Sequence, residues 1–161
     1  IAVAAFHDGM YAQAFPAFGV ERRGAPVQAF VRFSSEKIRL RSQIYEPDYI
    51  IVQDPTLIAD VNVYQGMREG GIAIVNTEKE QDAIRVPPGV KLVRVDATQI
   101  ALDVLGVPIT NTALMGAFAA ATGMIRFQAL ADAIRHRFGR DLAEKNIQAA
   151  RRAYEMVGGA S

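Results

Sequence analysis

The sequence predicts one α/β layered domain with a mostly parallel β-sheet. Short apolar runs of strand character are interleaved with segments of helical periodicity in the middle of the chain, and the last third is helical throughout. The chain has 161 residues, of which 50% are hydrophobic, and this is enough for one core. No linker or internal repeat indicates a second domain, so we assign residues 1–161 to a single unit.

The chain is expected to open with the end of a helix and two strands. Residues 1–6 (IAVAAF) have helical character, and Gly9 suits the left-handed position after a helix. A short strand is expected around residues 10–14. Alternation of apolar and other residues predicts a second strand at 27–33, with one apolar face. Since residues 1–6 read as a helix already under way, we expect a further N-terminal segment to precede Ile1.

A third alternating segment predicts a hairpin. Residues 38–42 (IRLRS) follow the polar turn Ser34–Lys37 and are expected to pair back on the strand at 27–33. In that arrangement Arg39 and Arg41 lie on the same face, because side chains alternate along a strand.

The middle of the chain predicts a strand–helix–strand unit. The apolar run 49–52 is typical of a strand covered on both faces, and Pro55 suits the start of a helix of about a dozen residues. A second apolar run, 72–75, is expected to lie parallel to the first. Residues 90–95 (VKLVRV) predict an edge or near-edge strand.

The remainder predicts helices with apolar stripes. The first begins after Asp96 and ends before Gly106, and Thr110 or Asn111 caps the second. The stripes of the last three are formed by Leu114, Met115 and Phe118, by Phe127, Leu130, Ile134 and Phe138, and by Ala143, Ile147, Ala150 and Tyr154.

Composition excludes several functions. A net charge of +1 argues against general nucleic-acid affinity, which needs a clustered basic excess. The chain contains no cysteine and therefore no thiolate ligand for an iron–sulfur cluster. His7 and His136 are in no recognisable metal-ligand spacing. We expect a cytoplasmic protein without a membrane span, because the longest apolar stretch, 113–125, is too short.

No arrangement of residues predicts catalysis by this chain. There is no nucleophile elbow, phosphate-binding P-loop or dinucleotide fingerprint. Asp54 and Asp96 stand at helix starts, where they are expected to cap free amide groups. We therefore assign no catalytic residue and no metal ligand.

The stretch Tyr11–Val27 (YAQAFPAFGVERRGAPV) combines aromatic, amide and guanidinium groups. A planar guanidinium suits a phosphate or carboxylate, and Gly24 allows a ligand to approach the backbone beside Arg22 and Arg23. The alternative is an ordinary loop whose arginines are solvated or paired with Glu21.

This stretch resembles the gamma subunit of the 2-oxoacid:ferredoxin oxidoreductase family, the pyruvate synthase type. The segments IRLRSQIYEPD (38–48), VNVYQGMREGG (61–71), NTALMGAF (111–118) and EKNI (144–147) resemble it as well. The likeness covers nearly the whole chain. It implies a Rossmann-like fold, with an N-terminal strand and a glycine-rich GGQG loop that are expected before Ile1.

The resemblance also implies a place in a larger complex. Its alpha, beta and ferredoxin-like delta partners are expected to hold thiamine diphosphate, Mg²⁺ and the iron–sulfur clusters. Such complexes decarboxylate a 2-oxoacid oxidatively to acyl-CoA and pass electrons to ferredoxin or a similar acceptor. The gamma subunit is expected to help bind coenzyme A (CoA). Pyruvate is the commonest substrate, with 2-oxoglutarate, branched-chain and aryl 2-oxoacids as relatives.

Matching the family's motif gives a ranked set of candidate residues. Arg22 and Arg23 are expected to bind CoA phosphate, with Gly24 allowing close approach. The residues expected second are Gln13 and Phe15, and Arg41 and Ser42 come third. Two other functions remain open at this point, a stand-alone CoA- or nucleotide-binding module and a purely structural subunit.

Overall fold

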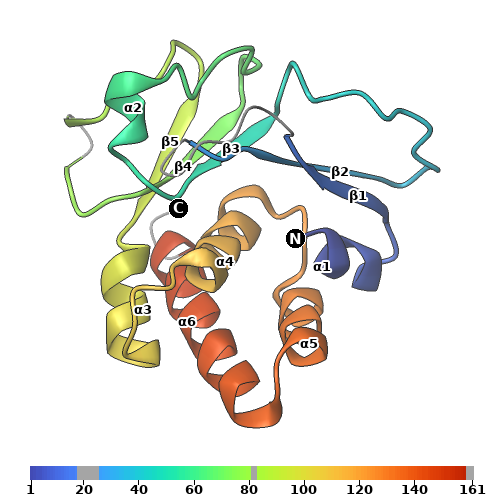
Figure 1. Ribbon diagram of the computed structural model, residues 1–161, viewed down its shortest axis with the longest axis vertical. Coiled ribbons are helices and arrows are strands. Elements are labelled where there is room, and N and C mark those ends of the chain that lie inside the picture. The colour runs from blue at the N-terminus through green and yellow to red at the C-terminus, as the bar shows by residue number, and fades with distance from the viewer. Residues whose placement is uncertain (18–25, 81–82, 159–161) are drawn as a thin grey trace.

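The computed structural model describes residues 1–17, 26–80 and 83–158 as strands above a layer of helices (Figure 1). This confirms the predicted α/β class and a Rossmann-like layered arrangement. In chain order the elements are α1 (Ala2–His7), β1 (Tyr11–Pro16), β2 (Ala29–Ser34), β3 (Tyr49–Val52), α2 (Leu57–Asp60), β4 (Ile72–Asn76), β5 (Lys91–Val95), α3 (Ala97–Leu105), α4 (Asn111–Thr122), α5 (Phe127–Arg137) and α6 (Arg140–Gly158).

The parallel sheet has the order β3-β4-β5 in the described part of the chain. Ile50 is paired with Ala73, and Ala73 with Leu92. The strand–helix–strand prediction is confirmed, as is the edge position of β5. Central β4 is buried almost throughout, because it has a neighbour on each side. The prediction that residues 49–52 are covered on both faces is wrong for their first three residues, which are half-buried on an edge strand.

The helix predicted from Pro55 is much shorter than a dozen residues. α2 ends at Asp60, and Val61 is already extended, with φ −131° and ψ 140°. The following residues instead pack on the chain before β3. A Cβ at Gly66 would lie 1.9 Å from the carbonyl oxygen of Tyr45, so only glycine permits this approach. This tertiary contact prevails over the helical spacing of apolar residues that predicted the longer helix.

A β-hairpin is present, but the partner of β2 is β1 and not the predicted segment 38–42. β2 pairs antiparallel with β1, from Tyr11 opposite Ser34 to Pro16 opposite Ala29. Residues 38–42 form no strand, and so the predicted pairing of this segment is wrong. β1 can face β2 over six residue pairs, and its Ala12 packs against the apolar core. The segment 38–42 is exposed apart from half-buried Ile38.

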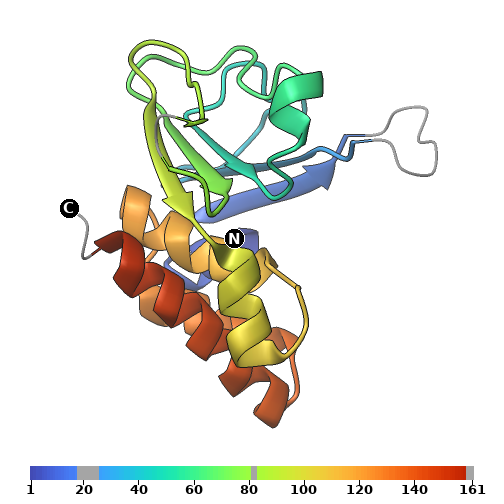
Figure 2. The same ribbon diagram turned by 90° about the vertical axis from the view of Figure 1, so that its left-hand side faces the viewer.

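The helical layer holds most of the core. α4 packs against α6 and also contacts β4 and β5 (Figure 2), while α1 packs against α5 (Figure 1). Small side chains bring α4 and α6 close together, and Leu114, Phe118 and Ile147 fill the remaining space. The carboxylate of Asp96 accepts a hydrogen bond from the amide of Gln99 at 2.8 Å and caps α3, as predicted.

Candidate functional site

One face of the β1–β2 hairpin carries the candidate site. Because side chains alternate along a strand, Tyr11, Gln13 and Phe15 lie on the same face of β1. Their partners on β2 are Ser34, Arg32 and Phe30, respectively. The opposite face turns to the core, where the rings of Phe33 and Phe118 meet edge to face at 6.4 Å between centroids. The hairpin is therefore fixed on one side and free to receive a ligand on the other.

Two aromatic rings form the apolar part of this face. The ring centroids of Phe15 and Phe30 are 5.5 Å apart and their planes are tilted by 36°. This is within the range of favourable aromatic pairs, so each ring fixes the other. Both side chains are half-buried and retain surface for further contacts.

A guanidinium group joins the hairpin to the segment that follows it. Arg32 donates from Nη1 to Gln13 Oε1 at 3.1 Å and from Nη2 to the carbonyl oxygen of Ser42 at 3.1 Å. Nη1 also lies 3.5 Å from the carbonyl oxygen of Leu40. Residues 40–42 are thereby held above the hairpin face.

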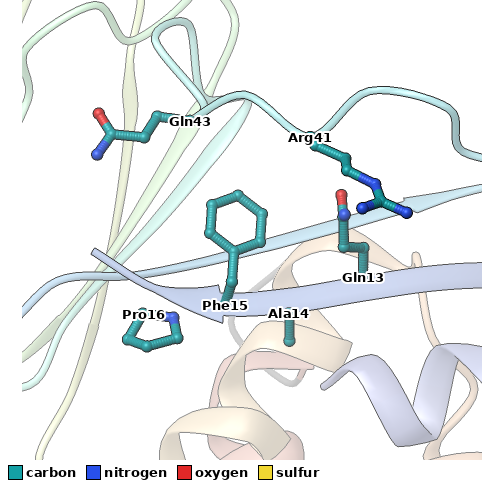
Figure 3. A pocket seen from close by; sticks show the side chains of 6 residues that line it. All are labelled: Gln13, Ala14, Phe15, Pro16, Arg41 and Gln43. Carbon is teal, nitrogen blue, oxygen red and sulfur yellow. The ribbon is translucent and has the colours of Figure 1, made fainter. Parts of the chain in front are cut away.

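An open pocket of about 510 Å³ lies between β1 and the segment that follows β2. In Figure 3, the Phe15 ring stands between the hairpin and the segment above it, and the Arg41 side chain descends toward Gln13. The lining consists of Gln13, Ala14, Phe15, Pro16, Arg41 and Gln43. The Arg41 guanidinium is exposed, so it is available to an incoming anion.

The lining combines three kinds of contact. The Phe15 ring offers an apolar surface for a planar group. The Arg41 guanidinium can hold a phosphate through two parallel hydrogen bonds. The amides of Gln13 and Gln43 supply both donors and acceptors. Together they suit a ligand that has a planar heterocycle next to an anionic group.

The structure brings three of the predicted site residues together. Gln13, Phe15 and Arg41 line the same pocket, although β1 and residue 41 are separated by a whole strand and a loop. Ser42 is not part of the lining, and its contribution is the carbonyl oxygen that accepts from Arg32. The residues ranked first, Arg22, Arg23 and Gly24, lie outside the described residues.

Residues 1–156 match the family model described as "Pyruvate ferredoxin/flavodoxin oxidoreductase". The chain belongs to this family, as a gamma-type subunit. It is 54% identical over 157 residues to the pyruvate synthase subunit PorC of Methanocaldococcus jannaschii, covering 98% of this chain and 86% of that one. It is 52% identical over 161 residues to the common gamma subunit of the pyruvate/ketoisovalerate oxidoreductases of Pyrococcus furiosus, with the same coverage.

A solved structure agrees with this assignment. The crystal structure of the pyruvate oxidoreductase subunit PORC from Thermotoga maritima matches with a TM-score of 0.84 and 36% identity, over 96% of this chain and 84% of that chain. The predicted family is thus confirmed, and so is the general role of this gamma-type chain as a subunit of a 2-oxoacid oxidoreductase complex.

Sequence reasoning did not find Arg32, Phe30 and Gln43 in this gamma-type chain. The sequence predicts Arg32 and Phe30 only as members of an alternating strand. Their roles depend on pairing with Gln13 and Phe15, and the sequence had indicated residues 38–42 as the hairpin partner. The available signal was the strand character of residues 10–14, which allowed β1 to be weighed as the alternative partner of β2.

A second hollow, of about 450 Å³, lies where α5 meets α6. Its guanidinium groups come from Arg135 and Arg140. Arg135 is held by Glu144 and Asp132, each at 3.1 Å, and the hydrogen bond that it donates to Glu144 raises the pKa of the arginine further above its usual range. Because these carboxylates already pair with Arg135, the hollow is less suited to an anionic ligand than the hairpin pocket.

Over the residues that the structure describes, no three His, Cys, Asp or Glu side chains gather in a way that could hold a metal ion. Within the same residues, none of the helices has the length and apolar character needed to cross a membrane.

Proposed function

We propose that this gamma-type chain helps bind CoA and assemble a 2-oxoacid oxidoreductase complex, and that it supplies no catalytic residue. The complex would decarboxylate a 2-oxoacid oxidatively to acyl-CoA and pass the electrons to ferredoxin or a similar acceptor. The observation that carries the proposal is the convergence of Gln13, Phe15 and Arg41 on one pocket.

The chemistry of this pocket supports a CoA contact. The nucleotide end of CoA has an adenine ring and phosphate groups. In the proposed complex the Phe15 ring packs against a planar or apolar part of CoA, and the Arg41 guanidinium pairs with a phosphate. Arg22 and Arg23, on the chain that continues from β1, are proposed to bind further phosphate, with Gly24 leaving room for it.

The redox cofactors are proposed to lie on partner subunits. This chain has no cysteine, and the usual iron–sulfur clusters are held by thiolates. Thiamine diphosphate would supply the carbanion chemistry, as cofactors do in reactions for which side chains are insufficient. Alpha, beta and ferredoxin-like delta subunits are the proposed holders of thiamine diphosphate, Mg²⁺ and the clusters.

The substrate is proposed to be pyruvate or a related 2-oxoacid. The Pyrococcus furiosus relative is named as a subunit common to pyruvate and ketoisovalerate oxidoreductases. One gamma subunit can therefore serve two 2-oxoacids, and this supports a choice of substrate made on other chains.

The test uses the complex assembled with all its subunits. Arg41→Met removes the guanidinium and keeps an apolar stem. We expect the KM for CoA to rise roughly tenfold, as for the loss of one exposed charge-assisted hydrogen bond, with kcat little changed. Arg39→Met is the matched control, because Arg39 is exposed in the same segment and is not part of the pocket lining.

The outcomes separate the proposed function from its alternatives. If Arg41→Met leaves the KM for CoA unchanged, as the control Arg39→Met is expected to do, the pocket does not bind CoA. If Arg22→Ala with Arg23→Ala dissociates the complex, the loop has the structural role. A chain that binds CoA and occurs only as a colourless monomer or homo-oligomer when purified natively would be a stand-alone binding module. Turnover of a 2-oxoacid by this chain alone would contradict a non-catalytic subunit.

A further inference from the structure

The segment 38–43 crosses the open face of the hairpin as a strap. The strap begins at Ile38 and is followed by Ile44. Both of these side chains are half-buried, whereas residues 39–43 between them are exposed. In the described part of the chain, no backbone–backbone hydrogen bond joins this strap to β1 or β2. A segment without such bonds needs another attachment if it is to hold one position.

Arg32 supplies that attachment. Its guanidinium reaches the carbonyl oxygens of Leu40 and Ser42, which flank Arg41 in the sequence. The same group is hydrogen-bonded to Gln13 on the neighbouring strand. The two carbonyls are thus tied to the hairpin through one rigid, planar fork.

Arg32 itself is not part of the pocket lining. Its Nη1 and Nη2 atoms are directed to Gln13 and the strap, whereas the exposed Arg41 guanidinium faces the pocket. The two arginines therefore have different tasks. One fixes the backbone on both sides of residue 41, and the other presents its charge to a ligand.

We propose that Arg32 is a positioning residue for the CoA contact, which fastens the strap and so places Arg41 beside Gln13 in the pocket that Phe15 also lines. The inference rests on the proposed function of the pocket. It predicts that loss of Arg32 weakens CoA binding chiefly through Arg41, with a smaller share through Gln13, which loses its hydrogen bond to Arg32. Lysine cannot replace Arg32, because a single ammonium cannot reproduce the fork that spans two carbonyls and the Gln13 amide.

The test is a double-mutant cycle in the assembled complex. It compares Arg32→Met, Arg41→Met and the double variant, with the KM for CoA and kcat as readouts. Arg32→Met keeps a stem that can cover the neighbouring residues. We expect each single variant to raise the KM roughly tenfold with kcat little changed, and the double variant to be much closer to Arg41→Met alone than to the product of the two effects. Independent roles would instead multiply the two effects.

One further variant keeps the result interpretable if Arg32→Met does not assemble. Arg32→Lys is expected to assemble and to show the same raised KM. A normal KM for Arg32→Lys, or multiplied losses in the double variant, would overturn the positioning role while the CoA site stands. No effect of Arg41→Met would overturn the CoA site itself, and with it this inference.

A second readout follows the strap directly. Trypsin cleaves after arginine, and Arg39 and Arg41 are exposed on the strap. Cleavage after these residues, followed by mass spectrometry, is expected to be at least severalfold faster in Arg32→Met than in the parent complex. If trypsin cuts the strap equally fast in Arg32→Met and in the parent complex, Arg32 does not hold the strap. If the strap is uncut in both, the mutant cycle decides.

Discussion

Gly116 of α4 lies directly against the backbone carbonyl of Ala150 in α6. A Cβ atom at Gly116 would be 1.9 Å from that oxygen and 2.6 Å from the carbonyl carbon. Both are backbone atoms and cannot rotate away, so Gly116→Ala must push the two helices apart. We expect this substitution to lower the free energy of unfolding by about 3 kcal/mol or more. Chemical denaturation of the purified protein measures the loss.

Gly139→Ala is the control for this prediction. A Cβ at Gly139 meets nothing within 4 Å, and Gly139 has no positive φ. Its effect on the free energy of unfolding is expected to be within about 1 kcal/mol. Equal losses in both variants would refute the role of close packing between α4 and α6.

A buried hydrogen bond lies along the same helix pair. Thr112 Oγ1 donates to Asn146 Oδ1 at 2.9 Å, and Asn146 Nδ2 donates to the carbonyl oxygen of Leu142 at 2.8 Å. Thr112→Val keeps the side-chain volume and leaves Asn146 Oδ1 without this donor. The expected loss of stability is about 1–3 kcal/mol in thermal or chemical unfolding. Thr112→Ser keeps the hydroxyl and is expected to lose less. A larger loss for serine than for valine would contradict this account.

The hydroxyl of Tyr64 is buried and has no hydrogen-bond partner among the described residues. Burial also raises the pKa of Tyr64 above its usual 10.0. Tyr64→Phe removes a polar group that is not satisfied by the protein, so the unfolding midpoint is expected to stay the same or rise slightly. Tyr45→Phe, at a residue that is 72% exposed, is the control and should be neutral. A loss of more than about 1 kcal/mol for Tyr64→Phe would show that its hydroxyl is bonded, for instance to water.

The turn after β3 predicts a pH effect. Asp54 Oδ1 accepts hydrogen bonds from Thr56 Oγ1 at 2.6 Å and from the Thr56 amide at 3.0 Å. The side-chain bond, and then the backbone bond, lowers the pKa of Asp54 below its usual 3.8. Because the folded pKa is depressed, the stabilisation is complete at neutral pH, where the carboxylate is ionised. It is lost as the pH falls through the lowered pKa.

Thr56→Val is expected to move the pKa of Asp54 back toward 3.8, since only the amide hydrogen bond remains. Thr56→Ser should leave it unchanged. Carboxyl NMR titration of the two variants measures both values, and an identical Asp54 titration in the parent and in Thr56→Val would contradict the assignment.

Much of the architecture could be predicted from the sequence because it depends on local patterns. The apolar runs at 49–52 and 72–75 became β3 and β4, and the stripes of the last helices became the buried sides of α4, α5 and α6. Asp96 became the cap of α3. These features depend on periodicity and on capping chemistry, which a short window of sequence contains.

The errors arose where distant contacts override local spacing. The helix from Pro55 stops at Asp60, because the chain packs through Gly66 onto the backbone of Tyr45. Residues 38–42 alternate like a strand, yet β1 takes the place beside β2. In both cases the partner is remote in the sequence, so local propensity could not identify it.

In the candidate site, too, some features could be predicted from the sequence and others depend on distant contacts. The sequence by itself determined the chemical groups, namely Gln13, Phe15 and Arg41, and through its family motifs the kind of complex in which they work. Only the tertiary structure decided that these groups share a pocket and that Arg32 holds the strap above it. The physical reason is that hydrogen bonds from one guanidinium join three segments whose proximity exists only in the folded chain.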